Sequence, residues 1–207
     1  MATVMLRVQA GPHRRIHCPV SAFVSAEKTI STAILTQGRK NVPCSVRKER
    51  GGLQVSWIVD DLAAGASAVY TLTTGKAPGG RTKGVEVSKG RGEVAVSIGG
   101  THFTTYCYGK HLARPHLYPV IGPYGDPVTR RLATPEDGRG LDHHHHRSIW
   151  ISHGEVNSWD NWSEGAGHGR TVHKRFEALE SGPAVGRVVS KGVWVGTDGW
   201  QGPPGKT

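Results

Sequence analysis

One segment of 32 residues, 142–173, concentrates the side chains that could do chemistry. Its sequence, DHHHHRSIWISHGEVNSWDNWSEGAGHGRTVH, holds seven of the twelve histidines, three of the six tryptophans and four carboxylates. Imidazoles and carboxylates transfer protons or bind divalent metals, and indole faces provide stacking surfaces for sugar rings. A polar, aromatic-rich segment of this density has no packing reason to exist, so it is the first candidate for a functional site.

Three interpretations of this segment stay open. A His and a Glu can act as general base and acid on a sugar. Several imidazoles with a carboxylate can hold a divalent metal, although the sequence contains neither an H-E-x-x-H nor a C-x-x-C spacing. The histidines can also simply cap turns and satisfy backbone groups of a polar loop. A strand predicted over 148–152 would bury Ile149 and Ile151 and leave the polar groups at its two ends.

The composition of the 207 residues favours a turn-rich β protein. Glycine and proline are frequent, with 29 and 12 residues, and no stretch shows a sustained helical period. Over residues 1–74, short runs rich in Val, Ile, Thr and aromatics alternate with turn clusters, which is typical of a small β-sandwich. Residues 75–84 are rich in Gly and Lys and predict a linker. We therefore expect an all-β protein with a small sandwich over 1–74 and a second β domain over 85–207.

The second domain begins with strands that alternate with period two. Val94, Val96 and Ile98 fall on one face, and a hairpin turn is expected at Gly99-Gly100. Residues 110–141 are predicted to be a long loop region, and later strands are expected over 171–181 and 184–196. The last of these strands has no evident partner, so we expect the chain to be the first part of a longer protein.

The net charge of +10 does not point to a nucleic-acid partner. Residues 1–83 hold 12 Lys and Arg against 4 Asp and Glu, but these basic residues come in short pairs without interleaved aromatics. No apolar run reaches the roughly 20 residues of a membrane span, so no membrane partner is expected. The three widely spaced cysteines, Cys18, Cys44 and Cys107, favour a reduced, cytoplasmic setting. Nothing in the sequence specifies an oligomeric state.

Five motifs of the second domain resemble a bacterial family known as methane oxygenase PmoA-like, whose function is unknown. They are Leu117-Tyr118-Pro119, Pro127-Val128-Thr129-Arg130, Asp142 to Arg147, His153 to Asn157, and Asp160 to Trp162. The resemblance is strong over about residues 110–180. Two positions depart from the family pattern: His144 stands where the family has Pro, and Glu155 stands where it commonly has Asp.

The resemblance implies both a fold and a chemistry. The implied fold is a β-supersandwich like that of galactose mutarotases, here incomplete and preceded by the small β-sandwich. Proteins of that fold usually act on carbohydrates through His and carboxylate acid/base pairs. The resemblance therefore implies a carbohydrate-active enzyme, such as an epimerase, a lyase or a hydrolase, with a sugar or sugar derivative as its ligand. Methane monooxygenase chemistry is not implied, because that enzyme is a membrane protein and this sequence holds no spanning segment.

The site residues expected from the segment and the resemblance fall into three groups. We expect His146, His153 and Glu155 to be catalytic. The two histidines would be proton-transfer groups or metal ligands, and Glu155 a general base or a carboxylate that orients a histidine. The expected substrate-binding residues are Tyr118, Arg130, Arg147, Asn157, Asp160 and Trp162. The sequence does not determine a cofactor; a divalent metal is the candidate, with His143 and His145 as its ligands. Two alternatives remain, namely a non-catalytic carbohydrate-binding module and a metal-dependent enzyme that uses the histidine cluster.

Overall fold

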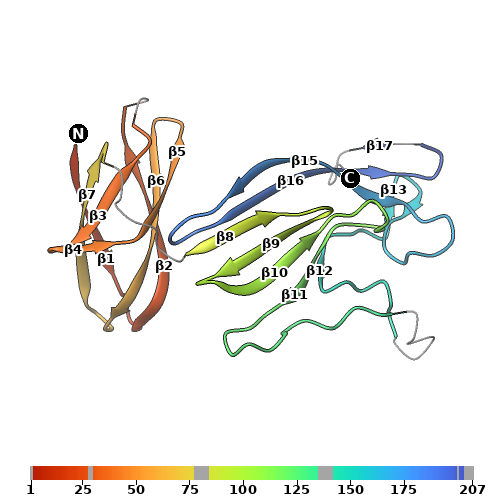
Figure 1. The fold of residues 1–207 in the computed structure, drawn as a ribbon, viewed down its shortest axis with the longest axis horizontal. Helices are drawn as coiled ribbons and strands as arrows, with labels where there is room; N and C mark the ends of the chain where they lie inside the picture. Colours follow the sequence, from red (N-terminus) through yellow and green to blue (C-terminus); the bar gives the residue numbers. More distant parts are fainter. Residues whose placement is uncertain (1, 28–29, 77–83, 135–141, 200, 203–207) are drawn as a thin grey trace. The chain divides into compact units, whose positions relative to one another are not determined.

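The computed structural model describes residues 2–27, 30–76, 84–134, 142–199 and 201–202 (Figure 1). Every regular element in these residues is a β-strand, so the expected all-β class is confirmed. The chain divides into two compact units: Met1–Val85 with Ser181–Gly186, and Glu86–Glu180 with Arg187–Thr207. Of the linker expected over 75–84, residues 77–83 lie outside the described part of the chain.

The first unit is formed by two antiparallel sheets around one apolar core. One sheet has the order β1-β7-β3-β4 and the other β2-β6-β5. The strands are β1 (Thr3–Gln9), β2 (Arg15–Ser25), β3 (Ala33–Gln37), β4 (Lys40–Val42), β5 (Cys44–Glu49), β6 (Gly52–Leu62) and β7 (Ser67–Thr74). Alternate residues of β6 (Leu53, Val55, Trp57 and Val59) are fully buried, as the period of a half-covered strand requires. These side chains belong to the apolar core of the first unit.

The second unit contains the segment of interest and three antiparallel sheets. Their strand orders are β12-β11-β10-β9-β8, β15-β16-β17 and β13-β14. The strands are β8 (Val85–Lys89), β9 (Glu93–Ile98), β10 (Thr101–Cys107), β11 (His116–Val120), β12 (Ile149–Trp150), β13 (Glu155–Val156), β14 (Trp159–Asp160), β15 (Arg170–Glu180), β16 (Arg187–Val195) and β17 (Gln201–Gly202). Residues 142–169, together with the segment that precedes β11, carry the candidate site.

Aromatic side chains join the β8–β12 sheet to the β15–β16 hairpin. The rings of Tyr108 and Phe176 meet edge to face with centroids 5.1 Å apart, and His173 lies 4.5 Å from Tyr108. The Tyr106 hydroxyl donates a hydrogen bond to Ser190 Oγ of β16 at 2.9 Å. Such edge-to-face pairs add to the free energy gained by burying the rings. The second unit is thereby a layered β structure rather than a set of separate hairpins.

The hairpin expected at Gly99-Gly100 is confirmed. β9 pairs with β10, and the two glycines between them have φ of 62° and 88°. A two-residue turn that follows the twist of the strands needs left-handed backbone at both positions, which glycine adopts without steric cost.

Three local predictions were wrong. The region 110–141 is not wholly loop, because residues 116–120 form β11. Ile149 and Ile151 are 48% and 79% exposed instead of buried, since β12 is short and lies at the edge of its sheet. The strand expected to lack a partner is central in its sheet: β16 pairs with β15, and its end pairs with β17. Among the described residues there is no helix with the length and apolarity of a membrane span.

Candidate functional site

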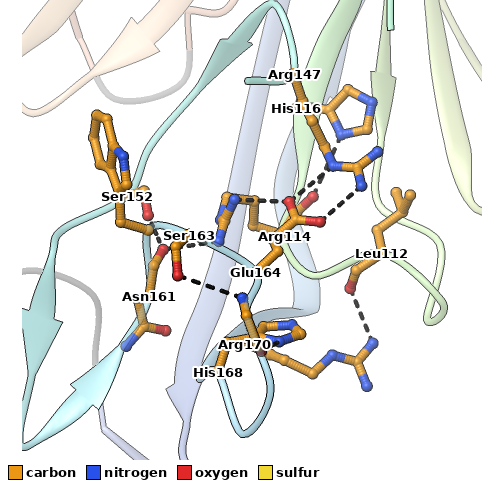
Figure 2. A network of polar contacts seen from close by, with 12 residues as sticks. Leu112, Arg114, His116, Arg147, Ser152, Asn161, Ser163, Glu164, His168 and Arg170 are labelled. Atoms are coloured by element: carbon orange, nitrogen blue, oxygen red, sulfur yellow. Dashed lines mark hydrogen bonds and ion pairs between the residues drawn. The ribbon is translucent and has the colours of Figure 1, made fainter. Parts of the chain in front are cut away.

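A buried carboxylate held by two arginines organises the candidate site (Figure 2). The Glu164 side chain is 10% exposed and Arg114 is 1% exposed. Arg114 Nη1 donates to Glu164 Oε1 at 2.9 Å, and Arg147 donates from Nε to Oε1 at 2.9 Å and from Nη2 to Oε2 at 2.7 Å. Charges this deeply buried are tolerated only when they are paired and hydrogen-bonded, as they are here.

The backbone places these groups from three separate segments. Arg114 lies just before β11, Arg147 just before β12, and Glu164 in the loop that follows β14. Glu164 has a left-handed φ of 55°, which is uncommon for a residue other than glycine. Arg114 Nη2 also donates to the Asn161 carbonyl oxygen at 2.8 Å, so the same guanidinium fixes the loop on both sides of Trp162.

The ionisation of Glu164 follows from these contacts. Burial alone would raise the pKa of its carboxyl, but the hydrogen bonds and charge of Arg147 and the charge of Arg114 outweigh burial and lower the pKa. Glu164 is therefore an anion at neutral pH with most of its acceptor positions occupied. It is a structural counter-ion and not a free acid or base.

Three aromatic rings lie next to this ion network. The Arg114 guanidinium carbon is 4.8 Å from the centre of the Trp150 ring, a cation–π contact. Trp150 and Trp162 have ring centroids 4.8 Å apart, and His146 lies 5.8 Å from each of them. These three rings, with Ser148, Ile149, Ile151 and Ser152, line an open hollow of about 550 Å³. We call Trp150, Trp162 and His146 the aromatic wall.

The four consecutive histidines form a tight turn. The His146 N–H donates to the His143 carbonyl oxygen at 2.9 Å, and His143 has a left-handed φ of 54°. Only His146 of this turn lines the hollow. Burial, together with the neighbouring imidazoles, lowers the pKa of His145, and its Nε2 is buried without a hydrogen-bond partner among the described residues.

The histidine turn does not assemble a metal site within the described residues. No group of three or more His, Cys, Asp and Glu side chains in that part of the chain is arranged to hold an ion. His143 and His145, the predicted metal ligands, have ring centroids 5.8 Å apart, and His143 Nδ1 contacts the Asp142 carboxylate. The arrangement is that of a turn stabilised by local contacts.

Two predicted catalytic residues lie in a separate exposed turn. His153 Nδ1 is 2.7 Å from the carbonyl oxygen of Glu155, so the imidazole is bonded to the backbone of the next strand. Glu155 is exposed at the start of β13. Among the described residues, no hydrogen bond or ring contact joins either side chain to His146. The structure therefore brings His146 together with Trp162 and leaves His153 and Glu155 apart from them.

Most of the other residues predicted to bind substrate form hydrogen bonds with backbone groups or lie in turns. Asp160 accepts hydrogen bonds from the N–H groups of Trp162 and Ser163 at 2.7 and 3.1 Å, so it shapes the loop that carries Trp162. Asn157 has a φ of 50° in the two-residue turn between β13 and β14. Arg130 donates to the Asp142 carbonyl oxygen, and Tyr118 is half-buried in β11.

Sequence reasoning missed Arg114, His116, Trp150 and Glu164 as site residues. Arg114 and His116 are both buried, and burial lowers the pKa of His116. A signal for these two existed: basic residues two apart in the otherwise apolar stretch LARPHLYPV share one face of an extended segment. Glu164 lies 50 residues from Arg114, so no local spacing reveals their pairing.

A family model described as "Family of unknown function (DUF6807)" matches residues 93–202, which is more than half of the chain. The matched range includes the ion network, the aromatic wall and the histidine turn. Neither curated proteins nor solved structures gave a match.

Proposed function

The chain belongs to the DUF6807 family of unknown function, and we propose that its second unit binds a carbohydrate against the aromatic wall. The observation that carries this proposal is the hollow of about 550 Å³ in which His146, Trp150 and Trp162 gather. Indole faces pack against the C–H face of a sugar ring, and the polar edge of such a ring needs nearby hydrogen-bonding groups. His146 and Ser152 line the same hollow, and Ser152 Oγ, which donates to the Asn161 carbonyl oxygen, can still accept a hydrogen bond from a ligand.

The exposure of the wall favours binding over simple core packing. Trp162 is 43% exposed, although an indole gains most free energy when it is buried. Asp160, through its hydrogen bonds to the Trp162 and Ser163 N–H groups, holds the loop in place. A fixed aromatic surface loses little conformational entropy on binding, which improves affinity for a small ligand.

The proposed catalytic form of this function uses His146 alone as the proton-transfer group. His146 is the titratable side chain that lines the hollow, and the nearby Glu164 is committed to two arginines. Glycoside hydrolysis generally needs two carboxyl groups about 5–10 Å apart. An epimerase or a lyase, which can work with one imidazole and a polarised sugar carbonyl, therefore fits the wall better than a hydrolase.

A non-catalytic carbohydrate-binding module is the second candidate. The observation that favours it is the separation of His146 from the other predicted proton-transfer groups, His153 and Glu155. A relation of the second unit to the galactose mutarotase-like supersandwich is likewise a proposal, supported by antiparallel sheets joined through aromatic packing. A cytoplasmic location stays a prediction from the cysteine content.

A binding experiment tests the proposal. Isothermal titration with a panel of neutral, acidic and amino sugars should find a ligand whose affinity falls at least about tenfold in Trp162→Ala, because one stacking contact is lost. Tyr124→Ala is the matched control, since Tyr124 is 93% exposed in the same unit and does not line the hollow. Binding that is unchanged in Trp162→Ala, or lost equally in Tyr124→Ala, would contradict the proposal.

A second experiment separates the enzyme from the binding module. Proton NMR of each bound sugar should show epimerisation or elimination by the wild type, and His146→Asn should slow it by about 100-fold or more. Sugar affinity should stay within about threefold in that variant, because the stacking surface is kept. Binding without any turnover by the wild type would leave the module as the function of this site.

A further inference from the structure

A second hollow in the same unit has a very different lining. It measures about 1040 Å³ and lies between the segment that follows β10 and the start of β15. Its walls include four permanent cations and two imidazoles, from Arg91, Lys110, His111, Arg170, His173 and Lys174. No carboxylate is found among its lining residues in the described part of the chain. The basic groups thus converge on one concave surface instead of being spread over a face.

This concentration of charge stands out against the rest of the unit. Several other cations of the second unit pair with acids, including Arg175 with Glu177 at 3.4 Å and Lys191 with Glu177 at 2.9 Å. Within the described residues, none of the four lining cations forms an ion pair. The nearest acidic side chain in sequence, Glu93, lies against Gly90 and does not line the hollow. The hollow therefore carries an uncompensated positive potential, which attracts anions.

Hydrogen bonds to the backbone fix the position of the Arg170 guanidinium in the hollow. Its Nη2 donates to the Leu112 carbonyl oxygen at 2.9 Å (Figure 2). The same Nη2 also donates to the Lys110 carbonyl oxygen. These bonds hold the segment that carries Lys110 and His111 against the start of β15. Because carbonyl oxygens do not neutralise a guanidinium, the charge of Arg170 remains available to a ligand.

Aromatic rings also line the hollow. Tyr108 and His173 both line it, with ring centroids 4.5 Å apart, and His173 Nδ1 is 2.7 Å from Ser190 Oγ. Burial and the charge of nearby Lys89 lower the pKa of His173, so this imidazole is neutral at pH 7 and presents a flat face. A ligand here meets both aromatic rings and cations.

We propose that this hollow binds a small organic phosphate. The four lining cations would hold the phosphate group, and Tyr108 and His173 would pack against the organic part. Lys and Arg are the usual phosphate-binding side chains, and apolar walls with a few placed charges are the usual lining of small-molecule sites. This inference is independent of the carbohydrate proposal, because it concerns other residues and another hollow.

The test measures phosphate binding by titration calorimetry with the whole chain. The probes are glucose 6-phosphate, inorganic phosphate and glucose, so that the charged group and the organic part are separated. The double variant Lys110→Ser/Lys174→Ser should bind glucose 6-phosphate at least about tenfold more weakly than the wild type, since two charged contacts are lost. The matched control, Lys191→Ser/Arg175→Ser, removes the same net charge from the Glu177 cluster of the same unit and should retain wild-type affinity.

Three outcomes bear on the proposal. Glucose 6-phosphate that binds more tightly than inorganic phosphate, with affinity lost only in the Lys110/Lys174 variant, supports an organic phosphate site. Equal affinity for both phosphates, or binding of glucose alone with the same strength, would overturn the organic-phosphate assignment. Equal loss in both double variants would overturn the site itself, because it would show a general effect of net charge. Trp162→Ala should leave phosphate affinity unchanged, so failure of the carbohydrate proposal is recognised separately.

Discussion

Arg147 donates two parallel hydrogen bonds to Glu164, from Nε to Oε1 at 2.9 Å and from Nη2 to Oε2 at 2.7 Å. This bidentate geometry is the strongest form of an arginine–carboxylate contact. Arg114 binds the same carboxylate and also faces Trp150. The two arginines and the glutamate therefore support the aromatic wall through the contact of Arg114 with Trp150.

The network predicts a large cost for neutralising Glu164. Glu164→Gln keeps the size of the side chain but leaves the buried Arg114 charge without a counter-ion. Breaking a buried pair in this way typically costs about 3–5 kcal/mol of the free energy of unfolding. Urea unfolding followed by tryptophan fluorescence measures it.

The control for that variant is Glu177→Gln, which removes a carboxylate from an exposed ion pair in the same unit. Exposed pairs contribute little, so its unfolding midpoint should stay close to that of the wild type. Equal midpoints for the two variants would show that Glu164 is not a structural counter-ion.

Three histidines whose pKa is lowered in the folded chain predict a pH dependence of stability. Burial is the main cause that lowers the pKa of His116, His145 and His173 in the folded chain. In the unfolded chain these groups titrate near about 6.5. Below that pH the unfolded state binds more protons than the folded state, so the free energy of unfolding should decrease as pH falls from 7.5 to 5.5.

His116→Gln tests this effect at the buried histidine, because protonating the His116 ring would place a charge where it is shielded from water. The variant should have a weaker dependence of unfolding free energy on pH over the same range. Glu164 does not affect this comparison. Because its pKa is lowered in the folded chain, it changes the pH dependence of the unfolding free energy only below about pH 4.5. A variant with the same pH dependence as the wild type would contradict this role of His116.

The fold was predictable where the determining signal is local. Alternation in β9 and β10 with Gly99-Gly100 between them specifies a hairpin from neighbouring residues alone. β11 was missed because Pro115, Pro119 and the flanking glycines are typical of loops, whereas its strand geometry depends on pairing with β10. The exposure of Ile149 and Ile151 depends on β12 lying at a sheet edge, which is also a tertiary property.

The candidate site was predictable as a segment but not as a set of contacts. The density of His and Trp singled out residues 142–173, and the structure brings His146, Trp150 and Trp162 of this segment into contact. The ion network requires residues 50 positions apart to meet, and sequence spacing carries no record of such pairing. Asp160, which was expected to bind substrate, accepts hydrogen bonds from the Trp162 and Ser163 N–H groups, and its residue type alone does not predict these local contacts.

Close packing around Gly169 predicts that this position does not tolerate a larger side chain. A Cβ at Gly169 would lie 2.7 Å from Asn161 Oδ1 and Nδ2, and Asn161 is buried with its carbonyl oxygen bound to Arg114. Gly169→Ala should therefore destabilise the second unit by about 1–3 kcal/mol through overpacking. The control, Gly154→Ala, meets nothing within 4 Å and should have a wild-type melting temperature. Calorimetry of both variants checks the prediction, and equal melting temperatures would refute it.

The central claim is that a sugar packs on Trp150 and Trp162, and indole NMR tests it most directly. In a ¹H–¹⁵N spectrum of the six tryptophans, titration with the ligand found by calorimetry should shift the Nε1–H signals of Trp150 and Trp162 in a saturable way. The signals of Trp57 and Trp194, which are buried, should stay fixed. Saturable shifts confined to Trp57 or Trp194, or no shift at Trp150 and Trp162 while the sugar binds, would contradict the account.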